Sequence, residues 1–170
     1  MFHGELDAET RAGLEVLRGR IHKAKVPSSC LDETLTIATW NIREFGRRPR
    51  RAASLHYIAE ILGQFDLVSV VELRDDTREL ETVLRYLGPY WDAVYSDYNT
   101  DRAGNRERVG FVYDRRAAVF TGLAGNVHAA RRDSGTGEYD VPGPDWWRPP
   151  YVASFAQTNP GRLGPEGRIS

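Results

Sequence analysis

The sequence of 170 residues has one cysteine, Cys30, and a formal net charge of −1. A single cysteine cannot form a disulfide within the chain, which excludes a disulfide-stabilised scaffold and is compatible with a reducing compartment. The small net charge provides no overall attraction for nucleic acid or for an anionic membrane. An anionic ligand would therefore have to be held by a local cluster of basic residues.

Long apolar segments are also missing from the sequence. No stretch approaches the ~20 mostly apolar residues that a membrane-spanning helix needs, and the first residues show no apolar segment typical of a secretory signal. We therefore expect a cytoplasmic protein with no membrane span. The content of 41% hydrophobic and 28% charged residues is typical of a globular protein rather than a disordered one.

The positions of the apolar residues predict an α/β fold. An amphipathic helix is expected from Asp7 to Lys25, with Asp7 as its N-cap. Further along, strand patterns alternate with two helical patterns, and several strands then follow. The expected strands are 35–42, 66–73, 91–95, 108–113, 117–123 and 150–155, and the expected helices are 50–62 and 77–87.

The segment from Asp66 to Leu73 is a nearly continuous apolar run. Such a run is typical of a strand that is covered on both faces, so the first strands of the sheet should be central. Residues 1–34 would form a helical extension and residues 35–155 the main domain. Residues 156–170 are rich in glycine and proline and show neither a strand nor a helix pattern, so we interpret them as an aberrant, disordered tail.

Asn41 and Glu72 are polar residues at the ends of two strands that should be buried. The carboxyl ends of neighbouring strands converge in open α/β sheets, which is where such sheets build their sites. A carboxylate there is costly to desolvate unless it is paired or binds a metal, and Mg²⁺ or Mn²⁺ commonly takes one or two protein carboxylates. Asn41 can orient a phosphate or an attacking water without adding negative charge. A structural interpretation is equally open, in which Glu72 pairs with Arg74 or Arg43 and the asparagine caps a turn.

Four short segments of the sequence carry motifs in a fixed order. They are Thr39–Ile42 with Phe45-Gly46 after it, Asp66–Glu72, Glu107–Tyr113 and Trp147–Phe155. In this order they resemble the opening motifs of the endonuclease/exonuclease/phosphatase superfamily, whose fold is the DNase I-like fold. The resemblance implies a two-sheet sandwich flanked by helices, of which this chain would be the N-terminal half, preceded by the N-terminal helix.

The resemblance also implies roles for individual residues. Glu72 matches the metal-binding glutamate, and Asn41 matches the asparagine near the metal and the scissile phosphate, so both are expected in the catalytic and metal site. Arg74 matches an arginine that contacts DNA in nuclease members, and Arg148 matches one that contacts a substrate phosphate. Arg108 could contact substrate in the same way, or it could form a structural ion pair with the preceding glutamate or a sheet neighbour.

These assignments predict a hydrolase of phosphate esters, of nuclease or phosphodiesterase type, with Mg²⁺ or Mn²⁺ as cofactor and with DNA or RNA among the candidate substrates. In the family, histidine and aspartate residues of the second half prepare the water, and here no residue after Phe155 is Asp or His. The strands would supply roughly one sheet, with its inner face uncovered. We therefore expect impaired activity, caused by a gene or reading frame disrupted near Ala156. The alternative is a non-catalytic remnant, or a module that binds phosphate or nucleic acid through its arginine clusters.

Overall fold

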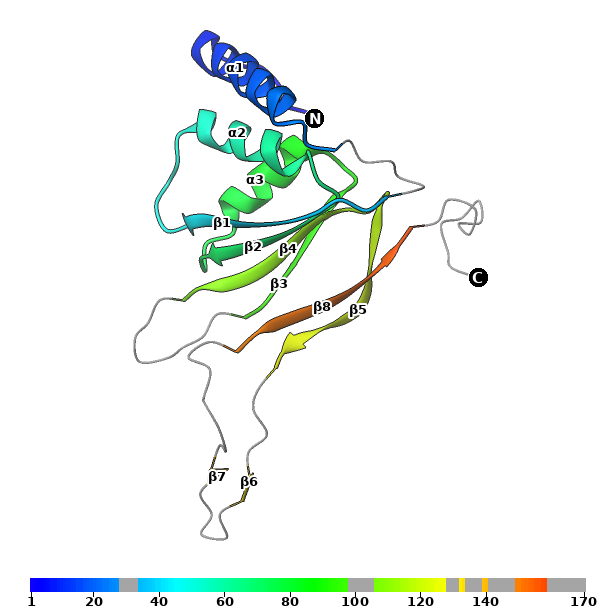
Figure 1. Cartoon of the computed structure of the whole chain (residues 1–170). Coiled ribbons are helices and arrows are strands. Elements are labelled where there is room, and N and C mark those ends of the chain that lie inside the picture. Colours follow the sequence, from blue (N-terminus) through cyan, green and yellow to red (C-terminus); the bar gives the residue numbers. More distant parts are fainter. Residues whose placement is uncertain (28–33, 98–105, 128–131, 134–138, 141–148, 159–170) are drawn as a thin grey trace.

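The computed structural model describes residues 1–27, 34–97, 106–127, 132–133, 139–140 and 149–158. These residues form a mixed α/β fold, in which three helices lie on one side of a four-stranded sheet and a two-stranded sheet lies on the other (Figure 1). None of the helices in these stretches is both long and apolar enough to span a membrane. The helices are α1 (Ala8–Ala24), α2 (Ala52–Leu62) and α3 (Arg78–Leu87). The strands are β1 (Ile37–Phe45), β2 (Leu67–Leu73), β3 (Trp91–Tyr95), β4 (Arg108–Asp114), β5 (Ala118–Asn126), β6 (Arg132–Asp133), β7 (Tyr139–Asp140) and β8 (Tyr151–Gln157).

The local signals in the sequence place the three helices correctly. Asp7 caps α1 as predicted, because its Oδ1 accepts a hydrogen bond of 2.6 Å from the backbone N–H of Thr10. Helices α2 and α3 end at Gly63 and Gly88, the two glycines that follow their apolar stripes. The prediction of an α/β fold that opens with a helix is therefore confirmed.

The larger sheet has the strand order β1-β2-β4-β3. Strands β1 and β2 are parallel and are connected through α2, whereas β4 is antiparallel to both of its neighbours. The prediction that the first strands are central is right for β2 and wrong for β1. Because β4 occupies the other side of β2, β1 lies at the edge of this sheet, and its residues alternate between exposed and half-buried from Ile37 to Asn41.

The main core lies between the larger sheet and helices α2 and α3. Val68 and Val70 of β2 and Val112 of β4 are each 1% exposed and face this core. Leu62 of α2 and Val83 of α3 are buried in the same cluster. Burying a side chain of this kind contributes about 1.5–3 kcal/mol. The apolar spacing that predicted the two helices is thus the spacing of the residues that hold them on the sheet.

The antiparallel pair of β5 and β8 packs against β4 on the opposite face of the larger sheet. Phe111 and Tyr113 alternate with the core-facing Val112 along β4, so they point to this second side. The ring of Phe155 in β8 packs edge-on against both, with centroid distances of 5.7 and 5.1 Å. The expectation of roughly one sheet with an uncovered inner face is therefore wrong for β4, which the second sheet covers through these aromatic side chains. It is right for β1, where Ile37 is 64% exposed and Thr39 and Asn41 are also exposed.

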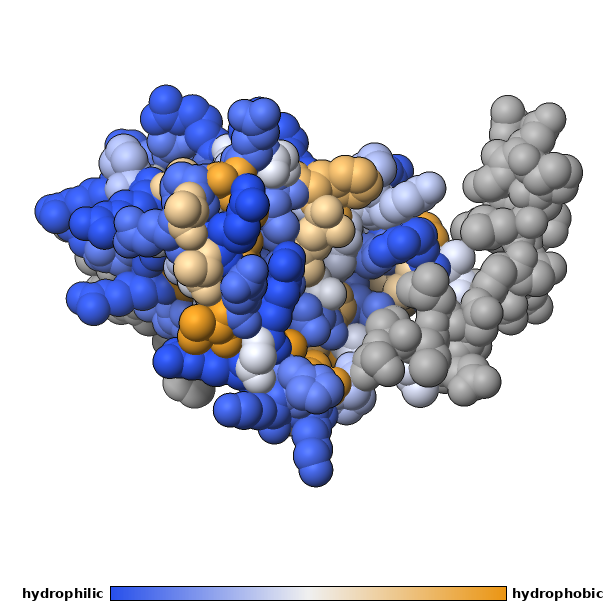
Figure 2. Space-filling model, turned by 90° about the horizontal axis from the view of Figure 1, so that it is seen from above, coloured by the Kyte–Doolittle hydropathy of each residue, from blue (hydrophilic) through white to orange (hydrophobic). Residues whose placement is uncertain are grey.

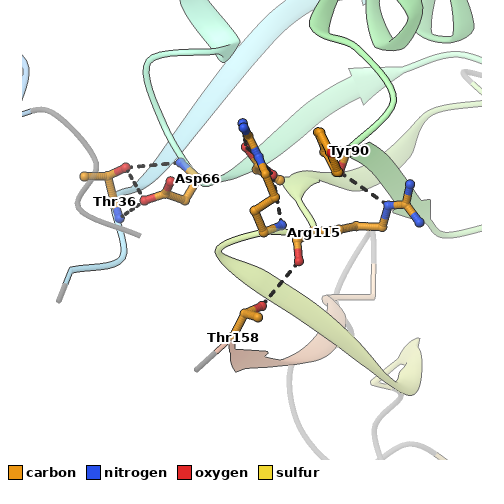
Figure 3. Close-up of polar contacts among 7 residues, drawn as sticks. Thr36, Asp66, Tyr90, Arg115 and Thr158 are labelled. Atoms are coloured by element: carbon orange, nitrogen blue, oxygen red, sulfur yellow. Dashed lines mark hydrogen bonds and ion pairs between the residues drawn. The ribbon is translucent and has the colours of Figure 1, made fainter. Parts of the chain in front are cut away.

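Strand β8 continues to Gln157, two residues past its predicted end at Phe155. The prediction that no strand residue follows Phe155 is therefore wrong for two positions, whose backbones pair with β5 without needing apolar side chains. The next residue, Thr158, is 6% exposed, and its N–H donates to the carbonyl oxygen of Ala117 at 2.9 Å. Its Oγ1 donates to the carbonyl oxygen of Arg115 at 3.3 Å (Figure 3). Residues 159–170 lie outside the described part of the chain.

Polar side chains also connect the elements at the amino ends of β1 and β2. Asp66 is 3% exposed and accepts hydrogen bonds of 2.7 Å from both the backbone N–H and the Oγ1 of Thr36 (Figure 3). Nearby, the Nε of Arg115 donates to the carbonyl oxygen of Tyr90 at 3.4 Å (Figure 3). These contacts are structural, and they lie at the end of the sheet away from Asn41.

Helix α1 packs on α2 through a close approach at Gly13. A Cβ atom added there would lie 1.8 Å from the hydroxyl oxygen of Tyr57, and the adjacent Leu14 is 1% exposed. A Cβ added at Gly19, on the same helix, would meet no atom within 4 Å. Seen from the α1 side, the surface is mainly hydrophilic with small apolar patches (Figure 2). The two helices therefore approach each other closely at Gly13 and not at Gly19, and a side chain at Gly13 would have to displace the ring of Tyr57.

We expect Gly13→Ala to destabilise the protein and Gly19→Ala to leave it unchanged or slightly more stable. Alanine is favoured over glycine inside a helix by ~1 kcal/mol, but at Gly13 the new methyl group collides with Tyr57. Urea unfolding of the two variants compares their free energies of unfolding, and Gly13→Ala should be the less stable by about 1 kcal/mol or more. Equal stability of the two variants would contradict the close approach of α1 to α2.

Candidate functional site

Both strands that carry the predicted site residues are interrupted near their carboxyl ends. On β1 the pairing register shifts between Asn41 and Phe45, and on β2 it shifts just before Leu73. Glu44 and Glu72, which lie in these two irregular stretches, have left-handed backbones with φ of 51° and 61°. This conformation costs a non-glycine residue roughly 1 kcal/mol or more and persists only where the surroundings hold it. The two bulges thus place two strained glutamates side by side.

Asn41 and Glu72 are in contact, as the convergence of the strand ends predicted. The Nδ2 of Asn41 donates to Oε1 of Glu72 at 2.7 Å, and the backbone N–H of Glu44 donates to Oε2 at 3.0 Å. These two hydrogen bonds, the one from Asn41 above all, hold the pKa of the Glu72 carboxyl below its usual value, and the charges of Arg74 and Arg43 add to the effect. The Glu72 side chain is therefore an ionised carboxylate at neutral pH.

A cleft with a volume of about 200 Å³ opens beside this pair. Strands of both sheets border it, because the larger sheet supplies Asn41 and Glu72 and the smaller sheet supplies Asn126 and Tyr151. Burial raises the pKa of the Tyr151 hydroxyl, and the charge of Asp97 raises it further. The other polar residues of the lining are Ser96, Asp97, Glu107 and Arg108.

The side chain of Arg74, predicted to contact substrate, is only 10% exposed. Its Nη2 lies 3.4 Å from Oε1 of Glu44 and 3.3 Å from Oε1 of Glu107. Its backbone N–H also donates to the carbonyl oxygen of Phe45 at 2.8 Å. The interactions that the structure gives Arg74 therefore tie the end of β2 to β1 and to the residue before β4, and a contact with substrate stays a prediction.

Arg108 lines the cleft, where its guanidinium carbon lies 5.3 Å from the centre of the Tyr95 ring. Glu107, one of the partners predicted for Arg108, forms an ion pair with Arg74. Arg148 lies outside the described residues. Among the three arginines that were predicted to bind substrate, Arg108 is thus the one that the structure places at the cleft.

Glu44 belongs to the site and was not predicted. Its backbone N–H holds Glu72, while its carboxylate pairs with Arg74 and with Arg47. The hydrogen bond from Arg47 is the main cause that lowers the pKa of the Glu44 carboxyl. The predicted strand ended at Ile42, before Glu44. A bulge breaks the alternation of side chains along a strand, so the sequence pattern did not indicate where Glu44 lies. The one available signal was the glycine directly after β1, which marks a sharp turn.

The donor atoms of Asn41 and Glu72 suit a hard divalent cation. A carboxylate has about four lone-pair sites, and the hydrogen bonds that described residues donate to Glu72 use two of them. The amide oxygen of Asn41 is a further oxygen ligand of the kind that Mg²⁺ takes together with several waters. In the described stretches, no group of three or more His, Cys, Asp or Glu residues is arranged for a metal. Water and substrate oxygens commonly complete the coordination of such a cation.

No protein-family model and no curated protein matches the sequence. The function of the chain is therefore inferred from the residues of the cleft. Sites in open α/β sheets lie beyond the carboxyl ends of the strands, and the contact between Asn41 and Glu72 has that position.

We expect Asn41→Ala to raise the pKa of Glu72 toward its ordinary value of 4.5, because the change removes the largest interaction that favours the ionised form. A carboxyl whose pKa is lower in the folded than in the unfolded state stabilises the fold above the unfolded pKa, and this stabilisation is lost as the pH falls through the folded pKa. An NMR titration of the Glu72 carboxyl carbon measures the shift. Thr39→Ala, at an exposed position of the same strand, is the control and should leave the pKa unchanged. An unaltered pKa in Asn41→Ala would count against the contact.

We expect Arg74→Ala to lower the free energy of unfolding by about 3 kcal/mol, because it removes a mostly buried guanidinium that lies within 3.4 Å of two carboxylates. Glu107, which carries one of the two, has a side chain that is only 11% exposed. Arg106→Ala is the control, since its ion pair with Asp75 is at the surface and should contribute less than about 1 kcal/mol. Urea unfolding measures both effects. An arginine that served only to contact substrate would show no such loss.

Proposed function

We propose that the cleft is the metal-binding end of a site that hydrolyses phosphate esters with Mg²⁺ or Mn²⁺, in a protein of nuclease or phosphodiesterase type. The observation that supports this function best is the 2.7 Å contact between Asn41 and Glu72 at the carboxyl ends of two adjacent parallel strands. An ionised carboxylate and an amide at the mouth of a cleft suit a hydrated cation and a phosphate group. The resemblance to the endonuclease/exonuclease/phosphatase superfamily supports the same function and a DNase I-like fold.

Each residue of the cleft has a distinct part in this proposal. Glu72 holds the cation through its carboxylate, and Asn41 orients that carboxylate and offers its amide oxygen. When bound, the cation supplies positive charge that stabilises the developing charge on the phosphoryl group and favours ionisation of the attacking water. Arg108 adds a fixed positive charge for a phosphate oxygen. By the resemblance, Arg148 contacts a further phosphate oxygen.

Hydrolysis also requires a group that takes the proton of the attacking water. In the family to which the resemblance points, histidine and aspartate residues serve this purpose. An ionised carboxylate and Arg108 at the cleft suit a metal and a phosphate even without such a group. The second candidate function is therefore binding of metal and phosphate without cleavage of the ester.

The experiment measures cleavage and metal binding on the same protein preparations. Bis(p-nitrophenyl) phosphate, single-stranded DNA and RNA serve as substrates, each with Mg²⁺, with Mn²⁺ or with EDTA. We expect Glu72→Gln to reduce cleavage by about a hundredfold or more, because several kcal/mol of charge stabilisation go with the metal and each 1.4 kcal/mol is about tenfold in rate. Glu15→Gln, at an exposed position on α1, is the matched control and should leave cleavage unchanged.

The outcomes separate the two candidate functions. Cleavage that persists in EDTA, or that is the same in Glu72→Gln, would contradict the proposed site. Calorimetric binding of Mn²⁺ that Glu72→Gln weakens, without cleavage of any substrate, would assign the cleft to binding alone. If the chain neither binds Mn²⁺ nor cleaves any substrate, both candidate functions are wrong for this chain.

A further inference from the structure

The N-terminal residues are held on the helical layer by a cluster of ionisable side chains far from the cleft. The backbone N–H of Phe2 donates to the carbonyl oxygen of Tyr86 in α3 at 2.6 Å. The next side chain, His3, lies between two residues of α2, His56 and Glu60. Arg18 of α1 reaches the same carboxylate of Glu60 through Nε at 2.8 Å and Nη2 at 2.9 Å. Residues before α1 and α1 itself thus both contact one shared cluster.

The two histidines of this cluster face each other through ring nitrogens. The Nδ1 atoms of His3 and His56 are 2.9 Å apart, and the Nε2 of His3 is 2.9 Å from Oε2 of Glu60. Both rings are shielded from water, since the His3 side chain is 8% exposed and His56 is 5% exposed. The His56 ring also stacks on the ring of Tyr86, with centroids 4.0 Å apart and an angle of 16° between the planes. Neither imidazole can turn away without leaving its packing.

The facing nitrogens limit the number of protons that the pair can carry. A hydrogen bond between two imidazoles needs one nitrogen with a proton and one without. With His3 donating through Nε2 to Glu60, the contact is satisfied when the pair is neutral, and also when it carries one extra proton. A second extra proton puts an N–H on each Nδ1, so that two donors face each other at the 2.9 Å separation. The docked arrangement therefore accepts one additional proton but not two.

The surrounding charges oppose the second proton as well. Glu60 is the carboxylate that faces the pair from α2, and Arg18 already neutralises it from α1. Asp7, just before α1, is the other acid that acts on His56, while α3 contributes the uncharged ring of Tyr86. Burial lowers the pKa of His56, the charge of His3 lowers it further, and Asp7 only partly opposes them. Because the folded pKa is below the unfolded value, the docked state is fully stable above about pH 6.5 and weakens as the pH falls through the folded pKa.

We propose that the His3–His56 pair is an acid-operated latch, which holds residues 1–24 on α2 and α3 at neutral pH and releases them when both imidazoles are protonated. The released segment takes up one proton more than the docked segment does. Below the free histidine pKa of about 6.5, each pH unit therefore lowers the docking constant by up to about tenfold.

The test follows amide hydrogen exchange in the whole chain between about pH 7.5 and about pH 5, with intrinsic exchange rates removed by using protection factors. We expect the protection of α1 amides to fall by about tenfold or more over this range, while that of the β2 amides is retained. The β2 amides show in the same experiment whether the main domain stays folded. Protection of α1 that does not depend on pH, or that falls only together with that of β2, would overturn the latch.

Variants assign the effect to the pair of histidines. His56→Phe keeps an aromatic ring on Tyr86 but removes the nitrogen that faces His3, so the loss of α1 protection in acid should disappear. His22→Gln removes an exposed histidine of α1 and should respond to acid like the unaltered protein. The same acid response in His56→Phe as in the unaltered chain would refute the proposal. If His56→Phe already lacks α1 protection at neutral pH, NMR titration of His56 in the unaltered chain decides, and release of α1 while His56 remains neutral would overturn the latch.

Discussion

The structure depends on the burial of β2. Helices α2 and α3 cover one face of the sheet, and β1 and β4 take both hydrogen-bonding edges of β2. On the other face of β2, Ser69 and Val71 are half-buried. A strand in this position can end in a charged residue only where the ladder breaks, since an unpaired buried carboxylate is costly. Glu72 lies at that break, with its backbone in a left-handed conformation that turns the side chain toward Asn41. Strand β2 thus contributes both to the core and to the cleft.

The charges around the cleft are divided between two tasks. Arg74 directs its guanidinium to Glu44 and Glu107, which are ion-paired partners within the protein. Glu72, by contrast, accepts its hydrogen bonds from two neutral donors, an amide and a backbone N–H. Neutral donors stabilise the ionised carboxylate without cancelling its charge, and that charge is what a cation would require. The ion pairs that the structure gives Arg74, two residues after Glu72, are thus within the protein, and the Glu72 carboxylate keeps its charge at the surface of the cleft.

Features that depend on local sequence were predictable, whereas features that depend on partners distant in sequence were not. The N-cap at Asp7, the apolar stripes of the helices and the buried run of β2 all have a periodic or positional signal. The convergence of Asn41 and Glu72 followed from the rule for parallel strands. No such signal shows that β4 pairs beside β2, that Phe155 packs against β4, or that Glu44 lies in a bulge. These three features depend on contacts between residues that are distant in sequence. Such contacts are set by how well strands and side chains pair in the folded protein, rather than by the local preference of each residue.

The bulge in β1 also affects the open edge of the larger sheet. An edge strand exposes a row of backbone donors and acceptors on which a foreign strand can pair, and repeated pairing of this kind leads to aggregation. In β1 that row is interrupted between Asn41 and Phe45. The carbonyl oxygen of Arg43, inside the interruption, accepts a hydrogen bond from the guanidinium of Arg50 and is thereby occupied. The irregularity that presents a carboxylate to the cleft thus also limits the regular part of this edge to the stretch from Ile37 to Asn41.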